Sequence, residues 1–147
     1  MIKESVLELF ERDLNKLMTE INLYKNEESL WLIKEGIGNS AGNLCLHLLG
    51  NLNHFIGAVL GNSGYIRERE KEFTLKHIPR KDLISGIENT IAVIKNTLSK
   101  LSEADLEKNF PIEVFGKPLT TGFLLIHLTT HLTYHLGQIN YHRRLLA

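Results

Sequence analysis

Apolar residues recur every three or four positions along four long stretches of the chain, a spacing typical of amphipathic helices. The first stretch runs from Ile2 to about Asn22, and the second from about Ala41 to Leu60. The third runs from about Arg80 to Leu101, and the fourth follows Thr120 or Thr121 and continues almost to Ala147. The pattern predicts four long helices, each with one face turned to a shared core.

The segments between these stretches carry signals for helix ends and shorter elements. Ser40 is a suitable N-cap for the second long helix, and the run Gly61–Gly64 is expected to end it. Short helical turns are expected at Glu28–Ile33 and after Ser102. The stretch Phe110–Pro118 is the only strand-like one, and we interpret it as a small hairpin or an extended loop.

Together these elements indicate an all-α protein built as a four-helix bundle, with short extra helices and a small hairpin-like insert before the last helix. The chain has 147 residues, close to the commonest length of one domain. It shows no internal repeat and no low-complexity tract. We therefore expect a single helical domain over residues 1–147.

Composition narrows the range of partners. Lys plus Arg and Asp plus Glu both number 17, so the formal net charge is zero, which argues against a nucleic-acid binder with a broad basic face. No apolar run reaches the roughly 20 residues of a membrane span, and the N-terminus lacks the apolar core of a signal peptide. We therefore expect a cytoplasmic protein. The single cysteine, Cys45, excludes an intrachain disulfide and a cysteine-type zinc cage.

Histidines are concentrated on two of the predicted helices, since six of the seven fall on the second and the fourth. His127, His131 and His135 are spaced by four, so neighbours in this series stack one turn apart on one helix face. On a helical wheel His135 lies within the apolar stripe of the fourth helix, His131 about 20° beyond its edge and His127 about 60° beyond it. The pair His131 and His135 is therefore expected to point into the bundle.

A site with two histidines needs at least one more ligand, and the second long helix offers His47 and His54. These residues are seven positions apart, so they share a face but lie about 10 Å apart along the helix axis. Only one of them can reach the same ion, and their spacing does not decide which. His54 and His127 thus remain alternative ligands.

The absence of carboxylates around these histidines indicates the chemistry. No Asp or Glu occurs between Ser40 and Ile66 or from Val114 to the end. A ferritin-like di-iron site needs inward glutamates, and the metalloprotease motif His-Glu-x-x-His is absent. A set of three neutral imidazoles remains, which suits Zn, Ni or Fe with positions open for water or substrate. Such an ion favours deprotonation of a bound water or thiol.

Two segments resemble motifs of the DinB/YfiT-like superfamily. Thr130–Ile139 (THLTYHLGQI) is similar to its "NHxxxHRGQ" signature, and Leu44–Asn51 (LCLHLLGN) is similar to its second-helix "HL.GN" segment. The order of helices and the insert before the last helix also agree, so the resemblance covers essentially the whole chain. It implies a four-helix bundle in a down-up-up-down arrangement.

The resemblance also implies a ligand set and a range of activities. Transferred residue by residue, the ligands are His47, His131 and His135, which resolves the choice between His47 and His54. Members with assigned activities include metal-dependent thiol-S-transferases that use bacillithiol or mycothiol, and related isomerases and hydrolases. The implied partners are a low-molecular-weight thiol and a small-molecule substrate, and members are commonly dimers.

Two positions depart from the signature. Leu136 stands where the family usually has Arg, and Thr130 stands where it has Asn. The missing Arg leaves the substrate and the presence of catalysis open. The alternative function is a non-catalytic helical binding or dimerisation module with a structural or vestigial histidine cluster.

Further residues are candidates for supporting or association roles. Gln138 lies one turn beyond His135 and Asn51 one turn beyond His47, so both are candidates to hydrogen-bond a ligand imidazole or a bound water. We also expect a two-fold homodimer that buries part of the fourth helix, because apolar residues extend there beyond one core stripe. These residues are Leu125, Ile126 and Tyr134. The C-terminal Arg143 and Arg144, together with Lys117, could attract an acidic thiol or simply complement the helix dipole.

Overall fold

Helix α1 (Ile2–Leu23) begins the chain in a computed structural model that describes all 147 residues. Its buried side chains recur at three-to-four spacing, as an amphipathic helix requires. They are Val6, Phe10, Asp13, Leu14, Leu17 and Ile21. The 3₁₀ helix η1 (Glu27–Trp31) follows and buries Leu30 and Trp31.

The second long helix is continuous but changes its winding. It begins as α2 (Ala41–Leu52), where the Ser40 hydroxyl accepts a hydrogen bond from the Asn43 backbone, and continues as the π-helix η2 (Asn53–Leu60). At the junction the Asn53 side chain donates to the Leu49 carbonyl and the Thr90 hydroxyl, both at 2.8 Å. Apolar periodicity predicts the extent of this helix, but it does not distinguish α from π winding.

The remaining elements are four α-helices, two short and two long. Ser102 caps α5 and Thr120 caps α6, each by accepting a backbone hydrogen bond. The chain is all-helical and contains no strand. The four are α3 (Arg69–Thr74), α4 (Arg80–Ser99), α5 (Glu103–Glu107) and α6 (Thr121–Leu146).

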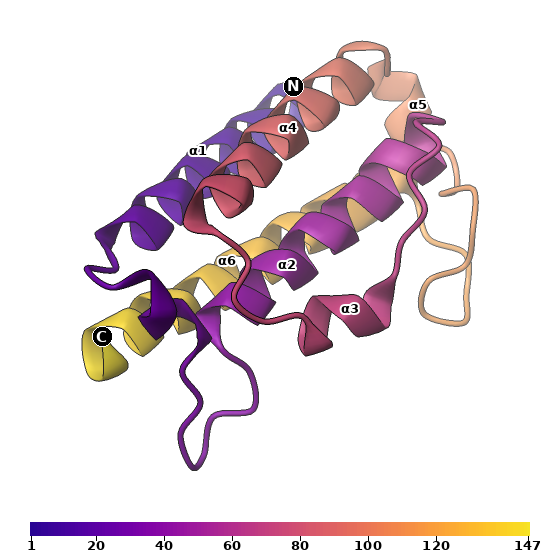
Figure 1. Cartoon of the computed structure of the whole chain (residues 1–147). Helices are drawn as coiled ribbons and strands as arrows, with labels where there is room; N and C mark the ends of the chain where they lie inside the picture. The colour runs from indigo at the N-terminus through magenta and orange to yellow at the C-terminus, as the bar shows by residue number, and fades with distance from the viewer.

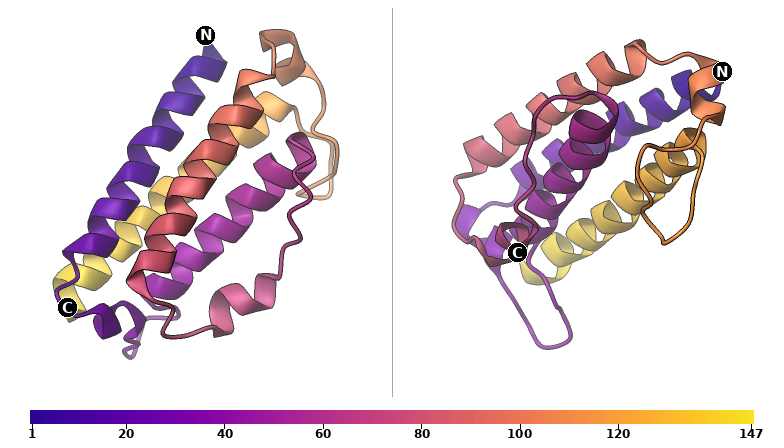
Figure 2. Two further views of the ribbon diagram at one scale, coloured as in Figure 1. Left: turned by 45° about the horizontal axis from the view of Figure 1, so that its top comes forward. Right: turned by 90° about the vertical axis from the view of Figure 1, so that its right-hand side faces the viewer.

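The four long helices lie side by side around one core (Figure 1). Helix α1 packs against α4 and α6, and α2 packs against the same two helices, as both views in Figure 2 also show. Helices α1 and α6 run in one direction and α2 and α4 in the other. Their inner faces form one cluster of 26 buried hydrophobic residues. This arrangement places the middle of α2 against the middle of α6.

The interpretation of Phe110–Pro118 as a hairpin is wrong, and its alternative, an extended loop, is what the structure shows. Only one isolated bridge, between Asn109 and Thr120, closes the segment at its base. The prolines at 111 and 118 lack backbone N–H groups, and Gly116 has a φ of +73°. A ladder of backbone hydrogen bonds cannot extend through such residues.

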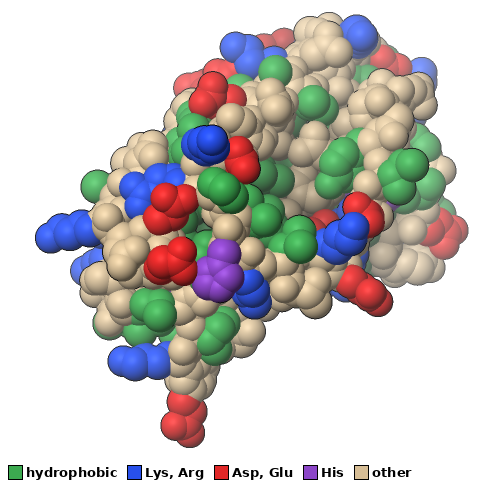
Figure 3. Space-filling view, in the orientation of Figure 1, with side chains coloured by type: hydrophobic (Ala, Val, Ile, Leu, Met, Phe, Trp, Pro, Cys, Tyr) green, Lys and Arg blue, Asp and Glu red, His purple; other side chains and the backbone are tan.

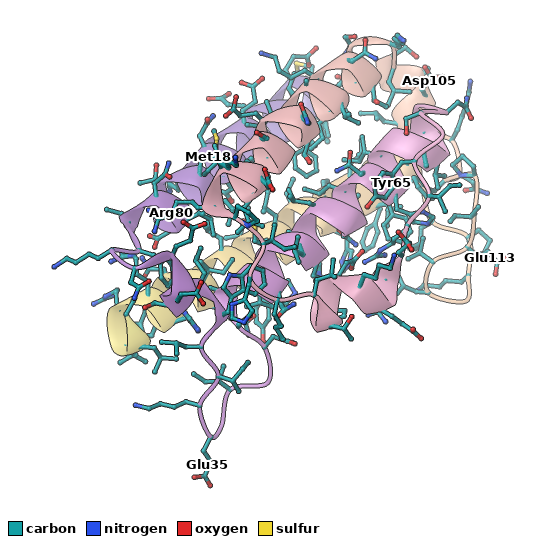
Figure 4. The ribbon with its side chains drawn as sticks, viewed as in Figure 1. Met18, Glu35, Tyr65, Arg80, Asp105 and Glu113 are labelled. Atoms are coloured by element: carbon teal, nitrogen blue, oxygen red, sulfur yellow. The ribbon has the colours of Figure 1, made fainter.

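Helix α3 has no counterpart among the predicted elements, because six residues are too few to show a helical period. It is held against α2 by the Asn43 side chain, which donates to the Glu72 carbonyl at 2.9 Å and the Leu75 carbonyl at 2.8 Å. The segment that leads from the end of η2 to α3 carries Tyr65 (Figure 4). The packing of α3 on α2 brings a carboxylate to the middle of the bundle.

One premise of the expected dimer is wrong. Leu125 is fully buried and belongs to the core, because α6 is covered over a wider arc than a single stripe. Ile126 and Tyr134 are exposed, at 43% and 65%. The dimer itself stays a prediction.

The face of the molecule in Figure 3 carries side chains of both charges among apolar ones. Acidic and basic side chains are interspersed over this face, where no broad patch carries one sign. None of the helices combines the length and the apolar character that a membrane crossing demands.

An ion pair between α1 and α6 gives the fold a testable dependence on pH. Burial alone would raise the pKa of Glu20, but hydrogen bonds from Arg143 at 2.7 Å and Asn140 at 2.7 Å outweigh it and hold the pKa below its ordinary value of 4.5. A lowered carboxyl pKa stabilises the fold above that value, and the contribution is lost as pH falls through it. We expect Glu20→Gln to lower the thermal midpoint by a few degrees at pH 7 and to have a progressively smaller effect as the pH falls below 4.5.

The matched control is Glu8→Gln, since Glu8 lies on the same helix, is exposed and has no ion-pair partner. Thermal unfolding followed by circular dichroism across this pH range measures both variants. A Glu20→Gln effect that persisted unchanged at pH 3 would contradict the electrostatic origin.

Candidate metal centre

Three imidazoles converge where α2 and α6 meet. His47 comes from α2, and His131 and His135 come from successive turns of α6. The Nε2 atom of His131 lies 3.3 Å from Nε2 of His47 and 3.1 Å from Nε2 of His135. One nitrogen from each ring lies within 4.8 Å of the other two, so the group could hold a metal ion.

The spacing of these nitrogens fits a small divalent ion. Nitrogen ligands at about 2.0–2.1 Å from zinc, placed at tetrahedral corners, are about 3.4 Å from one another. The Nε2 atom of His131 lies 3.3 and 3.1 Å from those of His47 and His135, which is close to that value. The three rings also meet nearly edge to face, with interplanar angles of 78°, 87° and 88°. The donor set therefore matches the geometry of a three-histidine site.

Hydrogen bonds fix the tautomers of the two outer rings. His47 Nδ1 donates to Glu72 Oε1 at 3.0 Å, and His135 Nδ1 donates to Gln138 Oε1 at 2.7 Å. A neutral imidazole carries one proton, so Nε2 of both rings is left with a free lone pair. Partners of this kind orient metal-binding histidines and raise their basicity.

The central ring, that of His131, has too few hydrogen-bond partners within the protein. His131 Nδ1 is buried and has no hydrogen-bond partner. Its Nε2 faces two bare nitrogens, and a single Nε2 proton can be donated to only one of them. At least one lone pair therefore stays unpaired in the protein alone, which is unfavourable for a buried polar atom. An ion between the three Nε2 atoms would satisfy these lone pairs, whereas Nδ1 of His131 would keep its proton without a partner in the protein.

The environment keeps the central imidazole neutral. Burial, together with the neighbouring His135, His47 and His127, lowers the pKa of His131 to about 4. Burial also lowers the pKa of His47, although the hydrogen bond from its ring to Glu72 opposes that effect. Neutral rings are the form that binds metal ions.

The sequence-based view of the site as free of carboxylates is wrong in one respect. Glu72 on α3 is 6% exposed and accepts the hydrogen bond from His47. Arg67 holds this carboxylate with two hydrogen bonds of 2.9 Å, one from Nε and one from Nη2. The ion pair is almost entirely shielded from solvent, with Arg67 13% exposed. The site thus includes a carboxylate–histidine pair clamped by a guanidinium.

Two glycines of α2 and one phenylalanine of α3 determine how closely the neighbouring segments pack around His47. A Cβ atom on Gly50 would overlap the Glu72 carboxylate, so glycine at this position leaves the space that the carboxylate occupies. Phe73, next to Glu72, stacks obliquely on the His47 ring at 4.9 Å between centroids. A Cβ on Gly42, nearer the start of α2, would similarly overlap Trp31. Close packing around α2 therefore positions His47.

The other candidates lie outside the group of three nitrogens. His54 lies in η2 and stacks edge to face on Phe55. His127 lies one turn before His131, at 6.5 Å between ring centroids, and also contacts Phe115. Asn51 is buried but makes no hydrogen bond to an imidazole, and its Oδ1 is unpaired. Gln138 is the supporting candidate that does bond a ring of the group.

The positions considered for a role in substrate binding, Leu136, Arg143 and Arg144, have side chains that are engaged away from the three histidines. Leu136 packs in the core, and it lines neither of the two pockets beside the group. Arg143 is paired with Glu20, and Arg144 stacks over Tyr141 at 5.1 Å. The guanidinium groups near the site are those of Arg67 and Arg69 instead.

Two buried side chains outside the group of three nitrogens serve the fold. His142 accepts a hydrogen bond from the Tyr24 hydroxyl at 2.7 Å and donates to the Leu32 carbonyl at 2.9 Å, which fixes the end of α6 to the segment after α1. The Cys45 thiol is fully buried, and burial raises its pKa to about 12. The thiol is therefore not available for chemistry at the surface, whereas His142 also lines a pocket that His135 lines.

Pockets approach the three histidines from two sides. One has a volume of about 530 Å³ and is lined by His135 and Gln138 together with the glycine-rich Gly36–Asn39 segment, Tyr134 and Tyr141. The other has a volume of about 280 Å³ and is lined by His47 and His131. No aspartate or glutamate lines either pocket. An ion held by the group is therefore reachable by small molecules from both sides.

A family model matches nearly the whole chain. The model of the family described as "Protein of unknown function (DUF1572)" matches residues 3–147. No curated protein matches the chain.

Proposed function

Because the chain belongs to the family described as "Protein of unknown function (DUF1572)", we propose its function from the site: a metal-dependent enzyme in which three histidines hold a divalent ion that activates a thiol or water for S-transfer or hydrolysis. The observation that carries this proposal is the convergence of His47, His131 and His135, with bare nitrogens 3.1 and 3.3 Å apart. Zn, Ni and Fe are the ions that such a set of imidazoles suits.

The proposal extends to the superfamily. The two motifs quoted above, the four long helices and the position of the three histidines all support membership of the DinB/YfiT-like superfamily, with its down-up-up-down bundle. That membership favours a low-molecular-weight thiol as one reactant and a small molecule as the other. Pockets on two sides of the histidines suit two reactants that meet there.

The protein residues have separable roles in this proposal. When bound, the ion supplies a positive charge that lowers the pKa of a thiol or water at its open position. Glu72 and Gln138 hold the Nδ1 protons of His47 and His135, so that both rings present Nε2 to the ion. His127 is the third imidazole that lines the smaller pocket, and it is available to accept a proton there, since no carboxylate lines that pocket.

Metal uptake by untagged protein is the first test of this function. We expect about one Zn, Ni or Fe ion per chain after purification without added chelator, because the bare nitrogens are pre-arranged. Elemental analysis measures the content, and thermal unfolding with and without a chelator measures the effect on stability. The metal-loaded protein should also accelerate the loss of free thiol when bacillithiol and an electrophile such as 1-chloro-2,4-dinitrobenzene are mixed.

The alternative, a binding or dimerisation module with a vestigial histidine cluster, gives a different result. In that case the content would stay below about 0.1 ion per chain, with no uptake from added Zn or Ni. Metal uptake without consumption of free thiol would support the ion site, contradict S-transfer to this electrophile and leave hydrolysis as the reaction to test.

A further inference from the structure

The smaller pocket beside the histidines has an apolar wall that no part of the proposed chemistry uses. Its volume of about 280 Å³ is enough for a small aromatic or branched molecule. Two of its aromatic side chains, Phe55 and Phe115, come from η2 and from the loop before α6. Leu124 and Leu128 from α6 complete this wall opposite His47. The pocket therefore favours a ligand with an apolar body over a purely polar one.

The charge of the same pocket is positive. Arg67 and Arg69 both line it, and no acidic residue does. The Arg67 guanidinium is engaged by Glu72. Arg69, in contrast, has no carboxylate within ion-pair distance, and its guanidinium lies 5.6 Å from the centre of the Phe73 ring. Arg69 is thus a cation free to pair with an anionic ligand.

A buried polar atom in the pocket lacks a partner. Asn51 is 8% exposed and lines the pocket one turn from His47. Its Oδ1 atom is buried and accepts no hydrogen bond. Buried acceptors are nearly always satisfied, and no donor of the protein bonds this oxygen. Because Asn51 lines the pocket, rotation of its side chain would expose Oδ1 to a hydroxyl or N–H group of a ligand.

We infer that this pocket binds a small organic anion that has an apolar body and a hydrogen-bond donor, with Arg69 pairing its anionic group and Asn51 accepting from its donor. The inference deepens the proposed function, on which it rests, because it assigns a substrate class to the pocket beside the ion. The anionic group is a carboxylate, a sulfonate or a phosphate, all of which a guanidinium recognises.

Three related probes test the inference on the full chain. 4-Hydroxybenzoate has an aromatic body, an anionic group and a donor; its methyl ester lacks the charge; and benzoate lacks the donor. We expect 4-hydroxybenzoate to bind the chelator-treated protein about tenfold more tightly than either of the others, because each lost charge-assisted or buried hydrogen bond is worth about one order of magnitude. Ligand-observed NMR titration gives the dissociation constants.

Variants assign the interactions to residues. Arg69→Gln should weaken 4-hydroxybenzoate about tenfold and leave the ester unchanged, since only the charge pairing is lost. Asn51→Leu should bring 4-hydroxybenzoate and benzoate to equal affinity. Arg144→Gln is the matched control, because Arg144 is equally exposed but stacks on Tyr141, far from this pocket's lining. It should bind all three probes like the unaltered protein.

The outcomes separate this inference from the proposed function. Equal binding of acid and ester, or an Arg69→Gln variant with unchanged affinity, would overturn the inference. Binding that appeared only in zinc-loaded protein and ignored Arg69 would overturn it too, because the carboxylate would then be ligating the ion directly. Zinc uptake is measured on the same samples: its failure alongside Arg69-dependent binding would overturn the metal-dependent enzyme and leave the anion pocket standing.

Discussion

His131→Ala is expected to abolish the stabilisation of this protein by zinc. The Nε2 atom of His131 lies between those of His47 and His135, so its loss leaves two ligands without the central one. For the unaltered protein, zinc at a thousandfold excess over its dissociation constant should raise the unfolding free energy by about 4 kcal/mol. The variant should show almost no gain, because its zinc dissociation constant should rise more than a thousandfold, well beyond the tenfold to hundredfold loss typical of a supporting residue, and so exceed the same zinc concentration.

The measurement is the thermal midpoint with zinc and with chelator, together with competition against a zinc-binding dye. His127→Ala is the matched control, since His127 lies one turn away on the same helix but contributes no nitrogen to the group. His135→Ala should behave like His131→Ala, which guards against a folding defect peculiar to one variant. Zinc stabilisation that survived in both would remove the three-histidine site from consideration.

Gly50→Ala is expected to reduce zinc affinity about tenfold to a hundredfold without touching a ligand. The new methyl group would occupy the space of the Glu72 carboxylate, which Arg67 holds in place. Glu72 must then move, His47 Nδ1 loses its acceptor, and α3 shifts from α2. The same displacement should lower the thermal midpoint of the metal-free protein, because a buried ion pair is disturbed.

Gly137→Ala is a matched control whose expected effect on stability is opposite to that of Gly50→Ala. Gly137 lies in the interior of α6, close to His135, and a Cβ there meets no atom within 4 Å. Alanine in a helix interior is more favourable than glycine by roughly 0.5–1 kcal/mol, so this variant should be more stable and bind zinc unchanged. Glu72→Gln, which keeps the size of the side chain, isolates the loss of charge. Wild-type zinc affinity in Gly50→Ala would show that Glu72 does not support His47.

The pairing of His131 with His135 could be predicted because it depends only on the spacing of residues within one helix. The four-residue spacing of His131 and His135 places both rings on one face of a helix, and that face can be read from the apolar residues around it. The cap residues Ser40 and Thr120 likewise act on backbone groups three positions away. The choice of His47 over His54, in contrast, required the family resemblance, because both lie on one face of the second helix.

Glu72 and Arg67 could not be predicted in the same way. They belong to a stretch between two long helices, and α3 is a six-residue helix with no apolar period of its own. Their position depends on tertiary contacts: the Asn43 side chain holds the carbonyl end of α3, and Gly50 leaves space for the carboxylate. Sequence patterns report the faces of long helices, whereas the docking of a short segment depends on the shape of the surface it meets.

Leu125 shows the limit of the helical wheel. An arc of apolar residues wider than one stripe was interpreted as an association surface, but Leu125 is fully covered within the chain. Helix α6 contacts α1, α2, α5 and η1, so several neighbours cover its circumference. The number of elements that pack around a helix depends on the whole fold, so it cannot be predicted from the sequence of that helix alone.

The distance in sequence between the histidines would give the proposed ion a second effect, on the mechanics of the fold. His47 and His131 are 84 positions apart, and their rings meet in the middle of the fold. An ion that joins them closes a loop that includes α3, α4 and α5, as a disulfide would, but through bonds that a chelator opens under mild conditions. Separation of α2 from α6 must then wait for release of the ion. Proteolysis and hydrogen exchange in the intervening helices would then depend on metal supply, so the histidines that hold the ion would also set the lifetime of the folded chain.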